Sequence, residues 1–214
     1  MTSQIDKPEP RWQVILALLA VAGIYMALPK ALIVGPEWLL PALVVVLLVP
    51  TVFAHRTGRH SLNHALGIAI CAIITFGLIA SVVLLVTTGG KEPALALLRS
   101  GGALWLTNVL VFALWYWRLD GGGPRERETK NEFGSRSFVF PQMQIEKMER
   151  KTFGVDGWRP GFVDYLFIAF TISSTFGPTD VPVLTHWAKL ITMTQILISL
   201  TIMVLLISRA VGVL

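Results

Sequence analysis

Six apolar runs divide this chain, and together they favour a helical bundle in a membrane. The runs cover residues 12–28, 38–53, 66–86, 103–117, 162–176 and 190–211. A helix needs about 20 apolar residues to cross the hydrocarbon core of a bilayer, and only segments whose backbone hydrogen bonds are satisfied are stable there. Charged residues make up 14% of the chain, whereas soluble domains carry roughly 25%. We therefore predict an all-α, polytopic helical membrane bundle with six apolar segments.

The basic residues predict how this bundle is oriented. If the N-terminus lies inside and six segments cross, the inner side holds 14 of the 18 Lys and Arg residues. Cytoplasmic loops carry an excess of these residues, so both termini are expected in the cytoplasm. The net charge of +5 then reflects orientation and contact with anionic headgroups, and no nucleic-acid partner is expected. Short tails and compact loops favour a bacterial inner (plasma) membrane.

The same runs divide the chain into four parts. Residues 1–11 are expected to form a cytoplasmic tail, and residues 12–118 a four-helix transmembrane region. Residues 119–160 are the one sizeable polar stretch, predicted to be a cytoplasmic linker with an amphipathic helix beginning at Pro141. Residues 161–214 hold the fifth and sixth apolar segments, which are predicted to form a hairpin.

The sequence offers little that points to catalysis, a metal or a cofactor. Cys71 is the only cysteine, which excludes an intramolecular disulfide and a cysteine metal cluster. His60 and His64 share a helical spacing, but they lie in a basic turn without acidic ligands. No nucleophile elbow, phosphate loop or zinc-protease motif is present. We predict no enzyme activity, no metal and no cofactor.

The end of the fifth segment is the best functional clue. Hydroxyl side chains lead to a predicted helix break at Gly177-Pro178, and an acid, Asp180, follows. Such hydroxyls can line an aqueous path, or they can bond to their own or neighbouring helices. A carboxylate near the outer surface can attract cations to a pore mouth, or it can cap a turn. The residues that would line an ion path are Thr171, Ser174, Thr175, Gly177, Thr179, Asp180, Thr194 and Thr201.

Residues 169–209 resemble the pore region of potassium channels. Thr175-Phe176-Gly177-Pro178-Thr179-Asp180 stands where that family has its Thr-Val-Gly-Tyr-Gly-Asp filter, and Thr185, Ala188 and Lys189 fall at the family's later offsets. The resemblance implies a filter role for Thr175 and Gly177 and an outer-mouth role for Asp180. Thr179 replaces the second filter glycine, so the filter is degenerate.

A second resemblance covers most of the chain. It is similar to a family of bacterial multi-pass membrane proteins of about this size, known as a domain of unknown function. The matching residues are Trp117-Arg118-Leu119-Asp120-Gly121-Gly122-Gly123-Pro124, Asp164-Tyr165-Leu166, Ala169-Phe170-Thr171-Ile172, Thr175-Phe176 and Thr179-Asp180-Val181. This resemblance implies location and topology, and it does not imply an activity.

Two functions therefore stay open. The first is a channel-like protein that passes monovalent cations through a pore built by several copies of the fifth and sixth segments, because one such pair cannot enclose a path. The second is a non-conducting structural or accessory membrane protein in which those segments only pack. A small transporter or an enzyme is a weaker alternative. The expected partners are the lipid bilayer, further copies of the chain and a monovalent cation.

Overall fold

The computed structural model describes residues 11–57, 59–88, 93–129, 136–146, 148–177 and 179–211. In this part of the chain the regular structure is helical, and a single antiparallel bridge joins Phe138 and Val183. The α-helices are α1 (Trp12–Ala27), α2 (Leu39–Arg56), α3 (His60–Thr88), α4 (Ala94–Leu119), α5 (Pro124–Thr129), α6 (Pro141–Gln144), α7 (Phe162–Thr175) and α8 (His186–Val211), with short 3-10 turns η2 (Lys30–Leu32) and η4 (Asp120–Gly122). The predicted all-α class is confirmed.

Three of these helices are long and apolar enough to cross a membrane, namely α3, α4 and α8. The other apolar helices are shorter. For example, α1 has 16 residues and α7 has 14. At 1.5 Å per residue, α7 is only about 21 Å long. The prediction of six spans is therefore not supported, although the protein remains compatible with a membrane. The fifth segment is indeed short.

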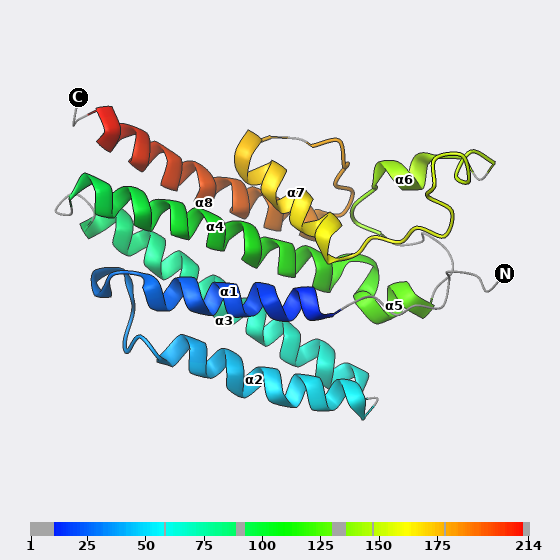
Figure 1. Ribbon diagram of the computed structural model, residues 1–214, viewed down its shortest axis with the longest axis horizontal. Helices are drawn as coiled ribbons and strands as arrows, with labels where there is room; N and C mark the ends of the chain where they lie inside the picture. Colours follow the sequence, from blue (N-terminus) through cyan, green and yellow to red (C-terminus); the bar gives the residue numbers. More distant parts are fainter. Residues whose placement is uncertain are drawn as a thin grey trace.

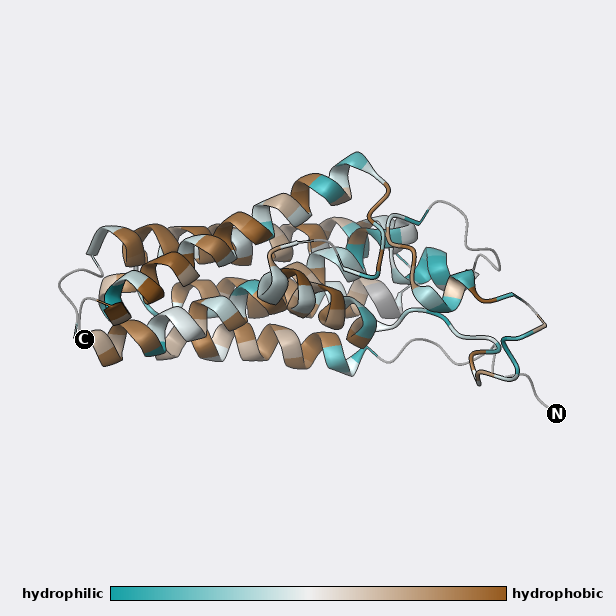
Figure 2. Ribbon diagram, turned by 90° about the horizontal axis from the view of Figure 1, so that it is seen from above, coloured by the Kyte–Doolittle hydropathy of each residue, from teal (hydrophilic) through white to brown (hydrophobic). Residues whose placement is uncertain are grey.

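Helices α1 to α4 run side by side in alternating directions, and α4 lies in the middle of the bundle (Figure 1). One side of α4 packs on α1 and α3, and the other packs on α7 and α8. Its largest buried side chains include Leu104, Phe112 and Tyr116. Hydrophobic residues dominate the helices along the bundle, and hydrophilic residues gather at the end that holds α5 and α6 (Figure 2).

Helices α7 and α8 are both antiparallel to α4, so they are parallel to each other. The start of α7 meets the end of α4, where the rings of Phe162 and Trp117 lie 6.4 Å apart. Further along, the ring of Phe170 lies 5.6 Å from that of Trp105. In α8, Thr192 bonds Tyr116 and Ser199 bonds Asn108. The predicted hairpin of the last two segments is therefore wrong.

Two consecutive helices can be parallel only if the chain between them turns back, and residues 176–185, the return loop, do this. Helix α7 ends at Phe176, which adopts a left-handed conformation with φ of 54°. The loop then runs back to residues 136–140, where Val139 N donates to Pro182 O at 3.1 Å and Leu184 N donates to Ser137 O at 2.8 Å. Segment 162–185 thus begins and ends at the same end of the bundle.

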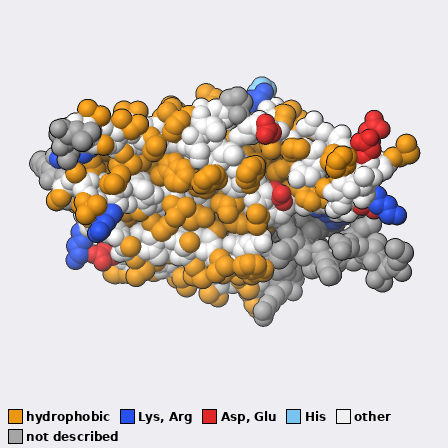
Figure 3. Space-filling model, turned by 45° about the horizontal axis from the view of Figure 1, so that its top comes forward, with side chains coloured by type: hydrophobic (Ala, Val, Ile, Leu, Met, Phe, Trp, Pro, Cys, Tyr) orange, Lys and Arg blue, Asp and Glu red, His pale blue; other side chains and the backbone are white. Residues whose placement is uncertain are grey.

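This path places the start of α1 and the end of α8 at opposite ends of the molecule (Figure 1). It also changes the expected linker. The predicted amphipathic helix from Pro141 is reduced to the four residues of α6, and Phe138 and Phe140 are buried against the bundle. On the face shown in Figure 3, charged side chains gather at one end and over the opposite third, and the surface between them is mainly hydrophobic.

Candidate functional site

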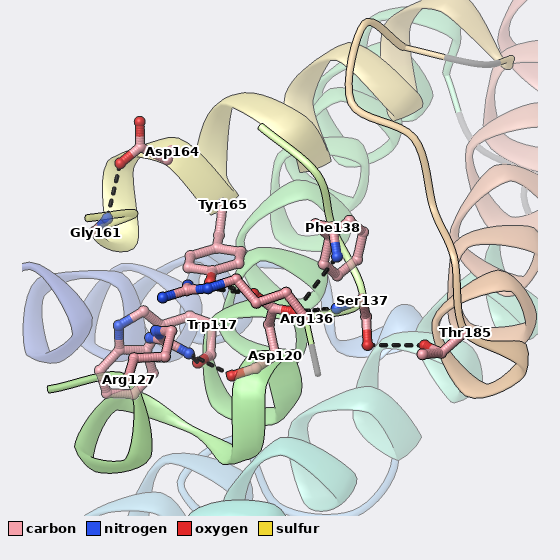
Figure 4. A network of polar contacts seen from close by, with 10 residues as sticks. All are labelled: Trp117, Asp120, Arg127, Arg136, Ser137, Phe138, Gly161, Asp164, Tyr165 and Thr185. Carbon is pink, nitrogen blue, oxygen red and sulfur yellow. Dashed lines mark hydrogen bonds and ion pairs between the residues drawn. The ribbon is translucent and has the colours of Figure 1, made fainter. Parts of the chain in front are cut away.

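A buried cluster at the end of α4 holds the linker and α7 together (Figure 4). Asp120 lies at its centre and is 0% exposed. Its Oδ1 accepts hydrogen bonds from the backbone N–H of Ser137 at 2.6 Å and of Phe138 at 3.4 Å. Its Oδ2 accepts a hydrogen bond from the Tyr165 hydroxyl at 2.7 Å. One carboxylate thereby connects α4, the 136–140 segment and α7.

Two guanidinium groups complete this Asp120 cluster. Arg136 Nη1 lies 3.9 Å from Asp120 Oδ2. Arg127 Nη1 donates to the carbonyls of Trp117 at 2.8 Å and Asp120 at 2.7 Å, and its guanidinium lies 5.0 Å from the centre of the Tyr165 ring. Burial lowers the pKa of Arg136 below its ordinary value, while the charges of Tyr165 and Asp120 oppose that shift.

Three glycines make this cluster possible. Gly121, Gly122 and Gly123 have φ of 59°, 79° and 97°, values that residues with a side chain rarely adopt. The chain therefore reverses within three residues after Asp120, and α5 brings Arg127 back to the end of α4. The Gly-rich stretch therefore both ends α4 and returns the chain to it.

The ends of α7 and of the return loop are attached at the same place. Asp164 Oδ2 accepts a hydrogen bond from the Gly161 N–H at 2.7 Å and caps the first turn of α7. Thr185, just before α8, donates to the Ser137 hydroxyl at 2.8 Å. Segment 162–185 is therefore held near its start by Tyr165, which donates to Asp120, and at its end by Ser137, whose N–H also bonds Asp120.

A cavity of about 510 Å³ lies between α7, the return loop and the linker. This volume is large enough for a small ligand. We call this site the α7 cavity. It brings together four of the eight residues predicted for an ion path. Its lining residues are Phe140, Pro141, Gln142, Val163, Asp164, Phe167, Thr171, Thr175, Thr179, Asp180 and Val181.

This cavity corrects the predicted position of Asp180. The sequence placed Asp180 near the outer surface and the linker in the cytoplasm, on opposite sides of the bilayer. In the structure Asp180 lines one cavity with Gln142 of the linker. The reason is the return loop, which brings the chain back after α7 to the 136–140 segment.

The hydroxyls on α7 bond to their own helix. Thr171 donates to Phe167 O at 2.7 Å, and Thr175 donates to Thr171 O at 2.8 Å. Ser174 does the same with Phe170 O at 2.8 Å, but it lies outside the cavity. Because the hydroxyl hydrogens of Thr171 and Thr175 are used in this way, these side chains can offer a ligand only oxygen lone pairs.

The remaining predicted residues are not brought to this site. Gly177 is absent from the lining of the α7 cavity, and Pro178 lies outside the described residues. Thr194 and Thr201 are exposed on α8, where they donate to Leu190 O at 3.0 Å and Leu197 O at 2.8 Å. The eight predicted residues therefore do not line one path within a single chain.

Sequence reasoning missed a buried polar network between α4, α7 and α8. Gln195 Nε2 donates to Ala169 O and to the Ser173 hydroxyl, both at 2.7 Å, and Gln195 Oε1 accepts from the Tyr116 hydroxyl. Asn108 Nδ2 donates to the Ser199 hydroxyl at 2.8 Å. The available signal was an amide inside an apolar run, since buried amides in membrane helices hydrogen-bond across helices.

No protein-family model, curated protein or solved structure matches the chain. Among the described residues there is also no group of three or more His, Cys, Asp and Glu side chains placed to hold a metal ion. The chemistry of the α7 cavity therefore has to be argued from its own residues.

Proposed function

We propose that this protein is an integral membrane protein that binds a monovalent metal cation, Na⁺ or K⁺, in the α7 cavity. The proposal is carried by the lining of that cavity. Asp164 and Asp180 supply two carboxylates, and no Lys, Arg or His is among the lining residues, although the chain as a whole carries a net charge of +5. Opposite charge within a partly enclosed site attracts cations.

The neutral groups of the cavity support the same choice. Gln142 Oε1 is buried and has no hydrogen-bond partner in the described structure. Thr171 and Thr175 present oxygen lone pairs, as described above. Oxygen acceptors suit a hard cation such as Na⁺ or K⁺ better than a transition metal that prefers nitrogen or sulfur ligands.

The interior of the bundle favours a protein that does not conduct ions as a single chain. Ser173, Gln195 and Ser199 are buried between α4, α7 and α8 and are bonded to one another or to Asn108, so these groups join the helices to one another. Conduction would need several copies arranged around the exposed face of α7 and α8. That face carries large apolar side chains, among them Phe167, Leu190 and Leu197, which suit lipid or a packed interface.

We further propose five crossings, by α1, α2, α3, α4 and α8, with α7 re-entrant. The N-terminus then lies in the cytoplasm and the C-terminus on the other side. Relative to six crossings, Lys189 moves to the inner side and Arg209 to the outer side, so the inner side still holds 14 of the 18 basic residues. The charge distribution alone therefore does not distinguish the two topologies, whereas thiol labelling does. In a Cys71→Ser background, a cysteine at Ser208 should react with an impermeant maleimide from outside.

Cation binding is tested by thermal unfolding of the purified protein in detergent. Potassium chloride or sodium chloride, compared with choline chloride at equal ionic strength, should raise the unfolding midpoint of the wild type, because a ligand that binds the native state stabilises it. Asp180→Asn should remove this rise. Asp156→Asn is the matched control, since Asp156 is exposed on the linker and does not line the cavity. An equal midpoint in all three salts would refute cation binding.

Conduction is a separate question with its own test. Ion flux into proteoliposomes is measured for the wild type, Asp180→Asn and Thr175→Ala. We expect wild-type flux no greater than that of empty vesicles. Flux that depends on Asp180 and Thr175 would favour the channel-like alternative over a non-conducting membrane protein.

A further inference from the structure

Arg118, in the last turn of α4, is a buried cation whose protein partners are neutral. Its side chain is only 8% exposed. Nη1 donates to Asn63 Oδ1 at 3.3 Å, and Nη2 donates to the Asn63 carbonyl at 2.8 Å. The guanidinium also lies 5.8 Å from the centre of the Trp117 ring. In the described part of the chain no carboxylate forms an ion pair with it.

A charge in this position is costly unless something balances it. Buried ions lose several kcal/mol of hydration, and a partner of opposite charge is the usual compensation. Asn63 cannot supply a charge, and its own amide is fixed by donating to Thr51 O at 2.9 Å. Arginine has five N–H donors, and the two hydrogen bonds to Asn63 leave donors for a ligand.

The fold makes room for this guanidinium. Gly67 of α3 faces it so closely that a Cβ at this position would lie 1.3 Å from Arg118 Nη2. Any other residue at position 67 would displace the arginine head. The neighbouring helix is therefore shaped around a charged group that the protein itself does not neutralise.

Two cavities meet at Arg118, and they differ in character. One, of about 330 Å³, is mainly apolar and lies between α1, α2, α3 and α4, with Val14, Leu18, Leu48 and Ile70 among its lining residues. The other, of about 280 Å³, is polar and is lined by Ser61, His64, Gly122, Gly123, Pro124, Arg125 and Glu126. Arg11, Asn63 and Arg118 line both. Glu126 is the one carboxylate among these residues, and it forms no ion pair with Arg118.

We propose that Arg118 binds the headgroup of an anionic lipid whose acyl chain occupies the apolar cavity. A molecule with one anionic end and one apolar end matches the change from polar to apolar on the two sides of the guanidinium. Basic pockets between membrane helices at the cytoplasmic side are suited to anionic headgroups, and a guanidinium matches the geometry of phosphate oxygens. The site lies between α1, α2, α3 and α4, so it is independent of the cation proposed for the α7 cavity.

Native mass spectrometry of the purified protein tests this proposal. The protein is released from micelles that contain phosphatidylglycerol or phosphatidylcholine, and a third sample contains inorganic phosphate without lipid. We expect adducts with phosphatidylglycerol, and at least about tenfold weaker binding in Arg118→Gln, because hydrogen bonds to a charged group contribute that much. Arg59→Gln, which removes an exposed arginine that lines neither cavity, should bind like the wild type.

Two further variants keep the charge and test the rest of the site. Gly67→Ala should weaken lipid binding by displacing Arg118, and Val14→Phe should weaken it by filling the apolar cavity. Both remain informative if Arg118→Gln does not fold. Unchanged phosphatidylglycerol adducts in Arg118→Gln and Gly67→Ala would overturn the proposal. Equal adducts with phosphatidylcholine, or occupancy by phosphate alone that Val14→Phe leaves unaffected, would overturn it as well.

Discussion

Arg118 and Asp120 are separated by one residue and are both buried, yet their surroundings are opposite. Asp120 accepts hydrogen bonds from two backbone N–H groups and a tyrosine, and Arg136 lies beside it. Arg118 has an amide side chain and a carbonyl as partners, and it borders two cavities. A buried charge that the protein surrounds completely fixes the fold, whereas one that it leaves beside a cavity is available to a ligand.

The largest expected effect comes from removing the charge that is fully surrounded. Asp120→Ala leaves Arg136 buried without the carboxylate beside it, and breaking a buried charge pair in this way costs about 3–5 kcal/mol. Denaturant unfolding in detergent measures this loss. Glu37→Ala is the control, because the Glu37–Lys30 pair at 3.3 Å is exposed and should cost less than about 1 kcal/mol. Similar losses in the two variants would contradict a structural role for the Asp120 cluster.

A smaller effect is expected at Tyr165, which links α7 to the same carboxylate. Tyr165→Phe keeps the ring contacts with Phe138 and Phe140 and removes one hydrogen bond to a charged group, worth about 1.5–3 kcal/mol. The double variant with Asp120→Ala should lose less than the sum of the two single losses, since the residues share one contact. Strictly additive losses would show that Tyr165 acts elsewhere.

The neutral network in the bundle should matter less again. Gln195→Leu removes hydrogen bonds to Ala169 and Ser173, and interhelical bonds in membrane proteins average about 0.6 kcal/mol with a maximum near 1.7. We expect a loss of about 1–2 kcal/mol in the unfolding free energy. Thr194→Val, next to it but exposed and bonded to its own helix, should change the stability very little. A greater loss at position 194 would place that residue in an interface.

The smallest effect on stability should come from Arg118. In lipid-free detergent, Arg118→Met removes a buried cation that has no carboxylate partner, and replacing such a charge with an apolar side chain is often neutral or stabilising. We expect a change within about 1 kcal/mol by the same unfolding measurement. A loss comparable to that of Asp120→Ala would end the contrast between the two residues and would mean that Asn63 alone suffices to balance Arg118.

The sequence indicated the helical class and the approximate position of every apolar helix, because runs of apolar residues can be read directly from the sequence. It also indicated a cluster of polar side chains around Thr175 and Asp180, and four of the residues predicted for an ion path do line the α7 cavity. The return of the chain after α7, which makes α8 parallel to α7, was not predictable in this way. Crossing and returning leave the same number of basic residues on the inner side, and the choice depends on contacts such as Ser137–Thr185 that lie 48 residues apart.

The different surroundings of the two buried charges at the end of α4 were equally hard to predict from the sequence. Arg118 and Asp120 stand next to a Gly-rich stretch and look like an ordinary polar helix end. Only the reversal at Gly121 to Gly123 separates them, placing Asp120 among Ser137 and Tyr165 and leaving Arg118 against α3. No local pattern encodes that division, since its partners come from three distant parts of the chain.

The return loop also governs the order in which the chain can be assembled in a bilayer. Its backbone is not helical, and such backbone is stable at membrane depth only where protein surrounds it. The groups that contact α7 and its loop belong to α4, the 136–140 segment and α8, and α8 follows α7 in the chain. Helix α8 supplies Gln195, which donates to Ala169 O and to the Ser173 hydroxyl of α7, so a chain that stops before His186 lacks part of the surface on which α7 packs.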